Sequence, residues 1–460
     1  MSGPAPGTTS VVPQRLVIVL PTSGAFDSRT YRIATTCARR GHDVTVLARA
    51  DAGLAGEEHD PAGYRIVRVA VDPIEALPFP TLWRRLRARR WRRAAAPGPT
   101  ASAATAAMAS PVRSSRGRLL ERVRVLGRGV WRVAAIALTV RAQARATARV
   151  DRGADLYHAM AYMGIPVGLA AAARRRSTPG GDHPPVVYDA RDIYLEARNL
   201  ARLPRPARWL VGRLERRWAR HAARVVTTNA AYAEEMRTRL GVPLPLVVMN
   251  CSATYRRADP RPRLFHEVLG LPLDRPVVLY HGGLFPERGI EQLIEAWPAV
   301  PGAELVLMGY GVLEAELPRR IAASGAADRI HLLPAVPPAQ LHDWVASADV
   351  AAMPIQPTTL NHQLTTPNKL FEAMAAATPV VASDLPGMAA IVNETGCGVL
   401  CDPTRPAAIA DAIRAILDAP PEARRAMADR AGHAADEIYN WETQAEALLA
   451  EYTRLTGRPW

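Results

Sequence analysis

The sequence predicts an α/β protein in which two doubly wound, Rossmann-like lobes follow one another along the chain. The chain has 460 residues, a length that suits two lobes of roughly 200 residues each. Its hydrophobic fraction of 48% and charged fraction of 22% are those of a globular protein. Apolar runs of strand length alternate with helical stretches in two separate series, which is the pattern of parallel sheets covered by helices. We expect the two lobes to face each other across a cleft.

The first series opens with the apolar run RLVIVLP at 15–21, which is typical of a strand buried on both faces. A helical stretch at 30–40 ends at Gly41, and the run DVTVLAR then predicts a second strand. The remaining strands of this series are expected at 64–70, 154–159, 185–190 and 223–229. Residues 1–255 are therefore predicted to form the N-terminal lobe.

The second series of strands begins after TYRRADPRPR at 254–263, a segment rich in Pro and Arg with the character of a linker. Its strands are expected at 276–282, 303–309, 329–335, 348–354 and 378–384. Residues 256–435 are therefore predicted to form the second lobe, and residues 436–460 a separate C-terminal helical segment.

An Arg-rich insertion at about 75–150 interrupts the first series. It contains an Ala, Pro and Ser stretch at 94–110 and a long helical pattern at 113–150 whose apolar stripe is flanked by arginines. One interpretation is a helix that packs on its own lobe. The other is a basic amphipathic helix that lies on an anionic membrane surface through Trp83, Trp91 and Trp131.

The formal net charge of +15 favours anionic partners such as nucleotides, lipid head groups or nucleic acid. Nucleic acid is disfavoured because the arginines gather in one insertion that lacks an aromatic-rich reading surface. The four cysteines are too few and too scattered for a disulfide scaffold, so we expect reduced core thiols. We find no signal peptide and no apolar run of membrane-spanning length, and expect a cytoplasmic protein.

The segment YHGGLFPERGIEQLIEAW at 280–297 places two glycines between a strand and a helix. Gly282 and Gly283 leave room for an anion to approach the backbone, the helix start supplies partial positive charge, and Arg288 adds a full one. This arrangement predicts a diphosphate site. An ordinary turn between strand and helix is the alternative.

Lys369 is the only lysine among 58 basic residues. It shares one face of a helix behind Pro367 with Glu372, three residues further on. A compact ammonium can approach phosphate oxygens in a crowded site, and the carboxylate one turn away can accept hydrogen bonds from ribose hydroxyls. The alternative is a surface ion pair within the helix.

These motifs carry a resemblance that covers nearly the whole chain. The stretches HGGL, ERGIEQLIEA, LVLMGYG and TTPNKLFEAMAAATPVVASDLPGM, with FDSRTYRIATTCARRGHDVTVLAR and VVYDARD before them, resemble the retaining GT-B glycosyltransferases of family 4 from bacteria. The resemblance implies a donor-binding C-terminal lobe, an acceptor-binding N-terminal lobe, and a final helix that crosses back to the N-terminal lobe.

The resemblance also implies site residues. Those with catalytic roles are His158, Arg288, Lys369 and Glu372. Those that bind the donor are Gly282, Gly283, Arg288, Val336, Thr365, Thr366, Asn368, Lys369 and Glu372. Those on the acceptor side are Asp27, Arg29, His158 and Arg191. No cofactor and no metal ion are expected, because such sites use helix N-termini and basic side chains instead.

The implied function is transfer of a sugar from a nucleotide-diphosphate sugar to a hydroxyl acceptor, in bacterial cell-surface glycan synthesis and with a lipid-linked acceptor. The alternatives are a natural-product transferase with a soluble acceptor, an epimerase or phosphorylase of the same fold, and a non-catalytic scaffold. Three positions depart from the family pattern: Leu364 where Glu is common, Met160 where the second His is common, and Arg191 in place of a His.

Overall fold

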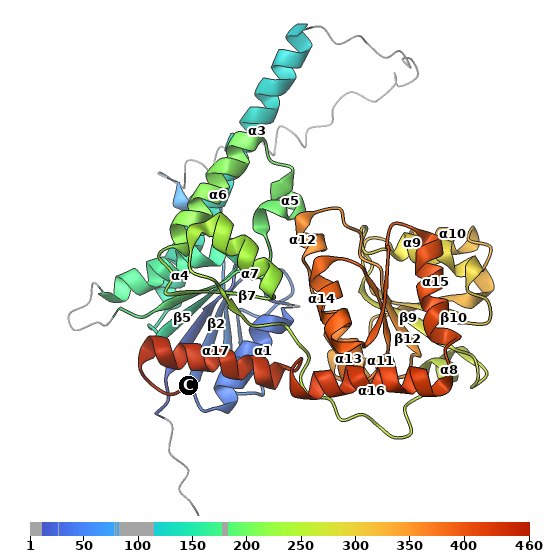
Figure 1. Cartoon of the computed structure of the whole chain (residues 1–460). Coiled ribbons are helices and arrows are strands. Elements are labelled where there is room, and N and C mark those ends of the chain that lie inside the picture. The colour runs from blue at the N-terminus through green and yellow to red at the C-terminus, as the bar shows by residue number, and fades with distance from the viewer. Residues whose placement is uncertain (1–11, 26, 78, 80, 82–114, 177–182) are drawn as a thin grey trace, which may run out of the picture. The chain divides into compact units, whose positions relative to one another are not determined.

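The computed structural model describes residues 12–25, 27–77, 79, 81, 115–176 and 183–460 (Figure 1). The chain divides into two compact units. The first holds the described residues up to Val225, with Thr238–Pro243 and Tyr452–Trp460; the second holds Val226–Arg237 and Leu244–Glu451. The α/β, GT-B fold class predicted from the sequence is confirmed, because each series of strands forms a largely parallel sheet.

The first sheet has eight strands, and every strand predicted for the first series is present. In spatial order they are β3 (Glu57–His59), β4 (Arg65–Val69), β2 (Asp43–Arg49), β1 (Arg15–Val19), β5 (Leu156–Met160), β6 (Val186–Asp189), β7 (Arg224–Thr227) and β8 (Leu246–Val247). The prediction missed β3 and β8. Both are short strands at the two edges of the sheet, and β3 runs antiparallel to β4.

Helices cover this sheet. They are α1 (Ser28–Arg39), α3 (Ser115–Val150), α4 (Ala161–Arg176), α5 (Arg198–Ala201) and α6 (Arg205–Ala219). The predicted Arg-rich helix is α3, and its first turns extend beyond the rest of the first unit (Figure 1). It packs against α6 where Gly129 leaves space, since a Cβ atom there would lie 3.0 Å from the ring of Pro204.

The second sheet has six strands, in the order β11 (Ile330–Pro334), β10 (Glu304–Tyr310), β9 (Val277–Gly283), β12 (Val350–Met353), β13 (Val380–Ser383) and β14 (Gly398–Cys401). Alternate residues of β9 enter opposite cores: Val277 and Leu279 on one face, Val278 and Tyr280 on the other. Burial on both faces explains why the strands appear in the sequence as unbroken apolar runs.

The helices of the second unit are α7 (Ala230–Met236), α8 (Leu264–Leu269), α9 (Ile290–Ala296), α10 (Leu317–Ala322), α11 (Leu341–Ala346), α12 (Leu360–Gln363), α13 (Asn368–Ala375), α14 (Pro386–Thr395), α15 (Pro406–Leu417), α16 (Pro421–Glu437) and α17 (Trp441–Thr456). The helices α7 and α8 precede β9, the others lie between or after the strands of the second sheet, and the last turns of α17 belong to the first unit. All four cysteines are buried and free, as expected. None of the helices in the described ranges is long and apolar enough to cross a lipid bilayer.

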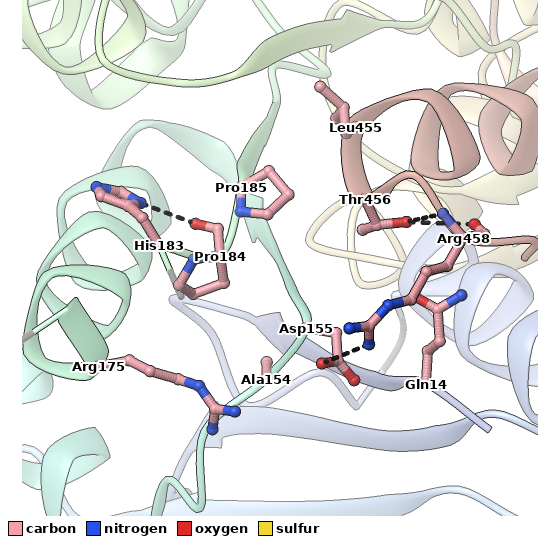
Figure 2. Close-up of a pocket in the computed structure, with 10 residues that line it drawn as sticks. All are labelled: Gln14, Ala154, Asp155, Arg175, His183, Pro184, Pro185, Leu455, Thr456 and Arg458. Atoms are coloured by element: carbon pink, nitrogen blue, oxygen red, sulfur yellow. Dashed lines mark hydrogen bonds and ion pairs between the residues drawn. The ribbon is translucent and has the colours of Figure 1, made fainter. Parts of the chain in front are cut away.

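The end of the chain packs on the first unit at the amino edge of its sheet. Figure 2 shows a small cavity there, between the segment around Arg458 and the residues that precede β5 and β6. Arg458 lies 3.7 Å from Asp155, and the side chain of Gln14 donates to the carbonyl of Pro459 at 2.6 Å. These contacts fasten the terminus at the edge opposite to the carboxyl ends of the strands.

Candidate active site

The turn after β9 has the backbone geometry of an anion site. Gly282 has a φ of 104° and Gly289, which caps α9, has a φ of 79°. Both values are strained for any residue with a Cβ atom. At Gly289 a Cβ atom would also lie 1.9 Å from the carbonyl oxygen of Pro354. Only glycine fits at this position, which brings Arg288 to the start of α9.

Lys369 lies in the first turn of α13 and reaches this turn. Its Nζ atom is 3.7 Å from the ring centroid of Tyr280, and a Cβ atom placed on Gly282 would lie 3.9 Å from the same Nζ. Nζ is buried and has no hydrogen-bond partner within the described residues. Burial, and then the positive charge of Arg288, lower the pKa of Lys369 to about 7 although Glu372 opposes them. A buried ammonium in this state would be stabilised by an anion.

Glu372, one turn after Lys369, is held by a histidine that is not among the predicted site residues. Nε2 of His281 lies 2.8 Å from Oε2 of Glu372, and His281 is almost fully buried. The sequence offered one signal for this role, since His281 directly precedes the two glycines.

The other predicted donor residues lie at the start of α13 or beyond β11. The side-chain amide of Asn229 donates to the carbonyl of Leu364 at 2.8 Å and lies 3.3 Å from the hydroxyl of Thr366. Thr365 lies in the same turn, before α13. Asn368 accepts a hydrogen bond from Asn250 at 2.8 Å. Gly283 ends β9, and Val336 follows β11 and packs, partly buried, against the core.

On the first unit, Asp27 and Arg191 form an ion pair at the carboxyl edge of the sheet. Nη1 of Arg191 lies 2.8 Å from both carboxylate oxygens of Asp27. Burial alone would lower the pKa of Arg191, but the neighbouring Asp27 charge outweighs it and raises that pKa. Asp27 also caps α1 by accepting from the backbone of Thr30. The pair is therefore fixed at the edge where open α/β sheets bind ligands.

Arg29 and His158 lie elsewhere, in a buried cluster around Asp189. Oδ2 of Asp189 accepts from Nε of Arg29 at 2.7 Å and lies 3.0 Å from Nε2 of His158. The other ring nitrogen of His158 lies 2.6 Å from the hydroxyl of Tyr452. Burial would raise the pKa of Asp189, but the Arg29 charge and these hydrogen bonds together lower it.

His158 has no exposed surface, and both of its ring nitrogens are occupied. These contacts link Asp189 through His158 to Tyr452, near the end of the chain, and the catalytic role of His158 stays a prediction. The structure brings Gly282, Arg288, Lys369 and Glu372 together and places His158 in the buried cluster around Asp189.

The donor-side arrangement suits a polyphosphate. It combines flexible glycine backbone, the start of α9, a buried ammonium and a second cation. No group of three or more His, Cys, Asp or Glu side chains that could hold a metal ion occurs in the described part of the chain.

Known proteins are similar to this chain over both units. Residues 24–251 match the family described as Glycosyl transferase 4-like domain, and residues 275–419 match Glycosyl transferases group 1. A D-inositol 3-phosphate glycosyltransferase of Xylanimonas cellulosilytica is 32% identical over 197 residues, which are 42% of this chain and 45% of that protein. The chain spans about half the length of the curated relatives it matches.

Solved structures share the fold over almost the whole chain. Sucrose-phosphate synthase from Thermosynechococcus elongatus has a TM-score of 0.67 at 19% identity, covering 96% of this chain and 100% of that one. The Anabaena protein HepE in complex with UDP-glucose has a TM-score of 0.61 at 17% identity, with the same coverage. The two family matches together span most of both units, and the chain belongs to family 4, group 1, of the glycosyltransferases.

Proposed function

We propose that this protein transfers a sugar from a nucleoside diphosphate sugar to a hydroxyl group of an acceptor, with retention of configuration at the anomeric carbon. The observation that supports it most is the buried ammonium of Lys369, which lacks a hydrogen-bond partner within the described residues and lies beside Gly282 and Arg288. An anion of high charge density would satisfy it. A related structure contains UDP-glucose, which is a donor of this class.

The proposed reaction requires the site to stabilise the nucleoside diphosphate as a leaving group. The bond between the anomeric carbon and the diphosphate oxygen breaks, the acceptor oxygen bonds to that carbon from the same face, and the hydroxyl proton passes to the departing diphosphate. Arg288, Lys369 and the start of α9 would neutralise the charge that develops on the diphosphate. Glu372, held by His281, would accept hydrogen bonds from the ribose hydroxyls. The stereochemistry can be read from the anomeric proton of the product by NMR.

Donor binding can be tested by thermal shift with UDP, ADP and GDP sugars. A donor present at 100 times its dissociation constant is expected to stabilise the folded protein by about 2.7 kcal/mol. Arg288→Ala should lose most of this shift. Arg319→Ala, which removes an exposed arginine of α10 in the same unit, should keep it. If Arg288→Ala is stabilised as much as the wild type, the diphosphate site lies elsewhere.

We also propose that the protein attaches to anionic membranes from the first unit, which would suit a lipid-linked acceptor of cell-surface glycan synthesis. On α3 Trp131 is 71% exposed, and on α6 Trp209 is 65% exposed, among exposed arginines. Exposed Trp with surrounding arginine is typical of an interfacial helix. Trp83 and Trp91, which we also predict to take part, lie outside the described residues.

Vesicle flotation tests the attachment. We expect the protein to float with phosphatidylglycerol vesicles, not with phosphatidylcholine vesicles, and to be released by roughly 0.5 M salt because the attraction is screened. Trp131→Ala should reduce flotation, whereas Leu273→Ala, at an equally exposed apolar residue of the second unit, should not. Equal flotation of both variants would remove α3 from the attachment surface.

A further inference from the structure

A cavity of about 390 Å³ opens in the first unit, at the carboxyl edge of its sheet. Arg49, the last residue of β2, lines it, as do Tyr162 and Met163 in the first turn of α4 after β5. The helix α3 also lines it, through Arg132 and Ile136. Ligands of open α/β sheets bind at this edge. Here the long helix of the Arg-rich insertion completes the site.

The cavity is lined by two arginines whose positive charge no described acidic side chain neutralises. Neither Arg49 nor Arg132 has an ion pair or a side-chain hydrogen bond within the described residues, and the described lining includes no Asp or Glu. The contrast with neighbouring arginines is clear, because Arg29 and Arg191 both bind carboxylates at 2.7–2.8 Å. The first turn of α4 adds partial positive charge of its own. Two guanidinium groups in the lining of one cavity, without a carboxylate beside them, favour a phosphate there.

Thr139 adds one hydroxyl to the lining, which donates to the carbonyl of Ala135, and most of the rest is hydrocarbon. Ile136, Met163, Leu200 and Leu203 supply it, and the ring of Tyr162, which packs 5.2 Å from that of Tyr194, extends the apolar wall. A polyol placed here would find few hydrogen-bond partners beyond the two arginines, Thr139 and Tyr162. An apolar group gains from the same surface.

A non-glycine residue with a left-handed backbone lies at the junction of β5 and α4. Ala161 has a φ of 61° and is nearly buried. Backbone strain of this kind persists where the surrounding structure imposes it, and strained residues are common at ligand sites. In this case it sets the direction of the first turn of α4, which carries Tyr162 and Met163 into the cavity wall.

We propose that this cavity binds an acceptor that carries a phosphate on an apolar group, with Arg49 and Arg132 on the phosphate and the α3 and α4 side chains on the hydrocarbon. That the bound molecule is the acceptor rests on the proposed transferase function, whereas the binding of a phosphorylated amphiphile is independent of that function. Two kinds of molecule share this chemistry, an isoprenoid phosphate and a glycerophospholipid.

Isothermal titration calorimetry with three soluble phosphates tests the proposal: geranyl monophosphate, dihexanoyl phosphatidic acid and inositol 3-phosphate. We expect geranyl monophosphate or dihexanoyl phosphatidic acid to bind at least ~10-fold more tightly than inositol 3-phosphate. The one that does shows whether the ligand is an isoprenoid phosphate or a glycerophospholipid. Arg49→Gln and Arg132→Gln should each weaken that binding by about 10-fold, as for the loss of one charged hydrogen bond. Arg141→Gln is the matched control, because Arg141 is exposed on α3 and does not line the cavity.

Three outcomes would overturn the proposal. They are equal losses in Arg132→Gln and Arg141→Gln, affinity for inositol 3-phosphate equal to that for the amphiphiles, and absence of binding by both amphiphiles. Melting temperatures show whether each variant is folded. Nucleotide binding by the same variants separates this inference from the transferase function: amphiphile binding without any nucleotide binding would leave the cavity assigned and the proposed function refuted.

Discussion

Lys369→Ala is expected to lower kcat/KM for the sugar donor by at least ~100-fold, the loss typical of removing one preorganised charge partner from a transition state. The ammonium lies beside the Gly282 turn with no hydrogen-bond partner in the described part of the chain, so the diphosphate would be its counter-ion. Steady-state kinetics with the donor identified by thermal shift provide the measurement. Turnover at the wild-type level in Lys369→Ala would refute the assignment.

Loss of folding is not expected to explain the result. A buried ammonium without a hydrogen-bond partner among the described residues is costly to the folded state, so its removal should leave the melting temperature unchanged or raise it. Lys369→Arg is the matched variant with the charge retained. The ammonium lies 3.7 Å from the Tyr280 ring, and the planar guanidinium needs more room, so partial activity is expected.

The pH dependence gives a second signature of the same residue. The pKa of Lys369 is lowered from 10.5 to about 7 in the folded protein. Above pH 7 the folded protein has lost this proton while the unfolded chain keeps it, so the stability of the free protein should rise between pH 7 and 10.5. Donor affinity should fall over the same range because the diphosphate binds the protonated form. Lys369→Ala should abolish both trends.

Much of the fold follows from the sequence because its strands are buried on both faces. Such strands are unbroken apolar runs, and each of those predicted is present. The three strands that were missed, β3, β8 and β14, are short and lie at sheet edges, where one side of the strand needs no apolar partner. β3 (Glu57–His59) and β8 (Leu246–Val247) have only three and two residues, too few for a local pattern to indicate a strand.

The site was predictable to a different degree in each unit. Lys369 stood out by composition, and its spacing from Glu372 placed both on one helical face, as the structure shows. His158 lies third in a five-residue strand buried on both faces, inside the strand predicted at 154–159, and its catalytic and acceptor-side roles stay predictions. The residue pattern of a fully buried strand does not show which of its side chains belong to a site. The cavity beside Arg49 depends on where α3 packs, which no local pattern indicates.

Gly289→Ala is expected to destabilise the second unit and to weaken donor use, and Gly302→Ala provides the control. Both glycines have a left-handed backbone, with φ of 79° and 75°, so each alanine should cost about 1 kcal/mol of unfolding free energy from backbone strain. Only Gly289 also faces a backbone atom, the carbonyl oxygen of Pro354, which would lie 1.9 Å from the new Cβ atom, whereas nothing lies within 4 Å at Gly302. Gln356 donates its backbone N–H to the carbonyl of Glu287. A shift of the Pro354 backbone should therefore also move the loop around Arg288, at a further ~1–3 kcal/mol of unfolding free energy.

Calorimetry should therefore show a larger fall in melting temperature for Gly289→Ala than for Gly302→Ala, with a raised donor KM in Gly289→Ala alone. Equal losses in the two variants would mean that backbone strain, and not the close approach to Pro354, is what requires glycine at the start of α9.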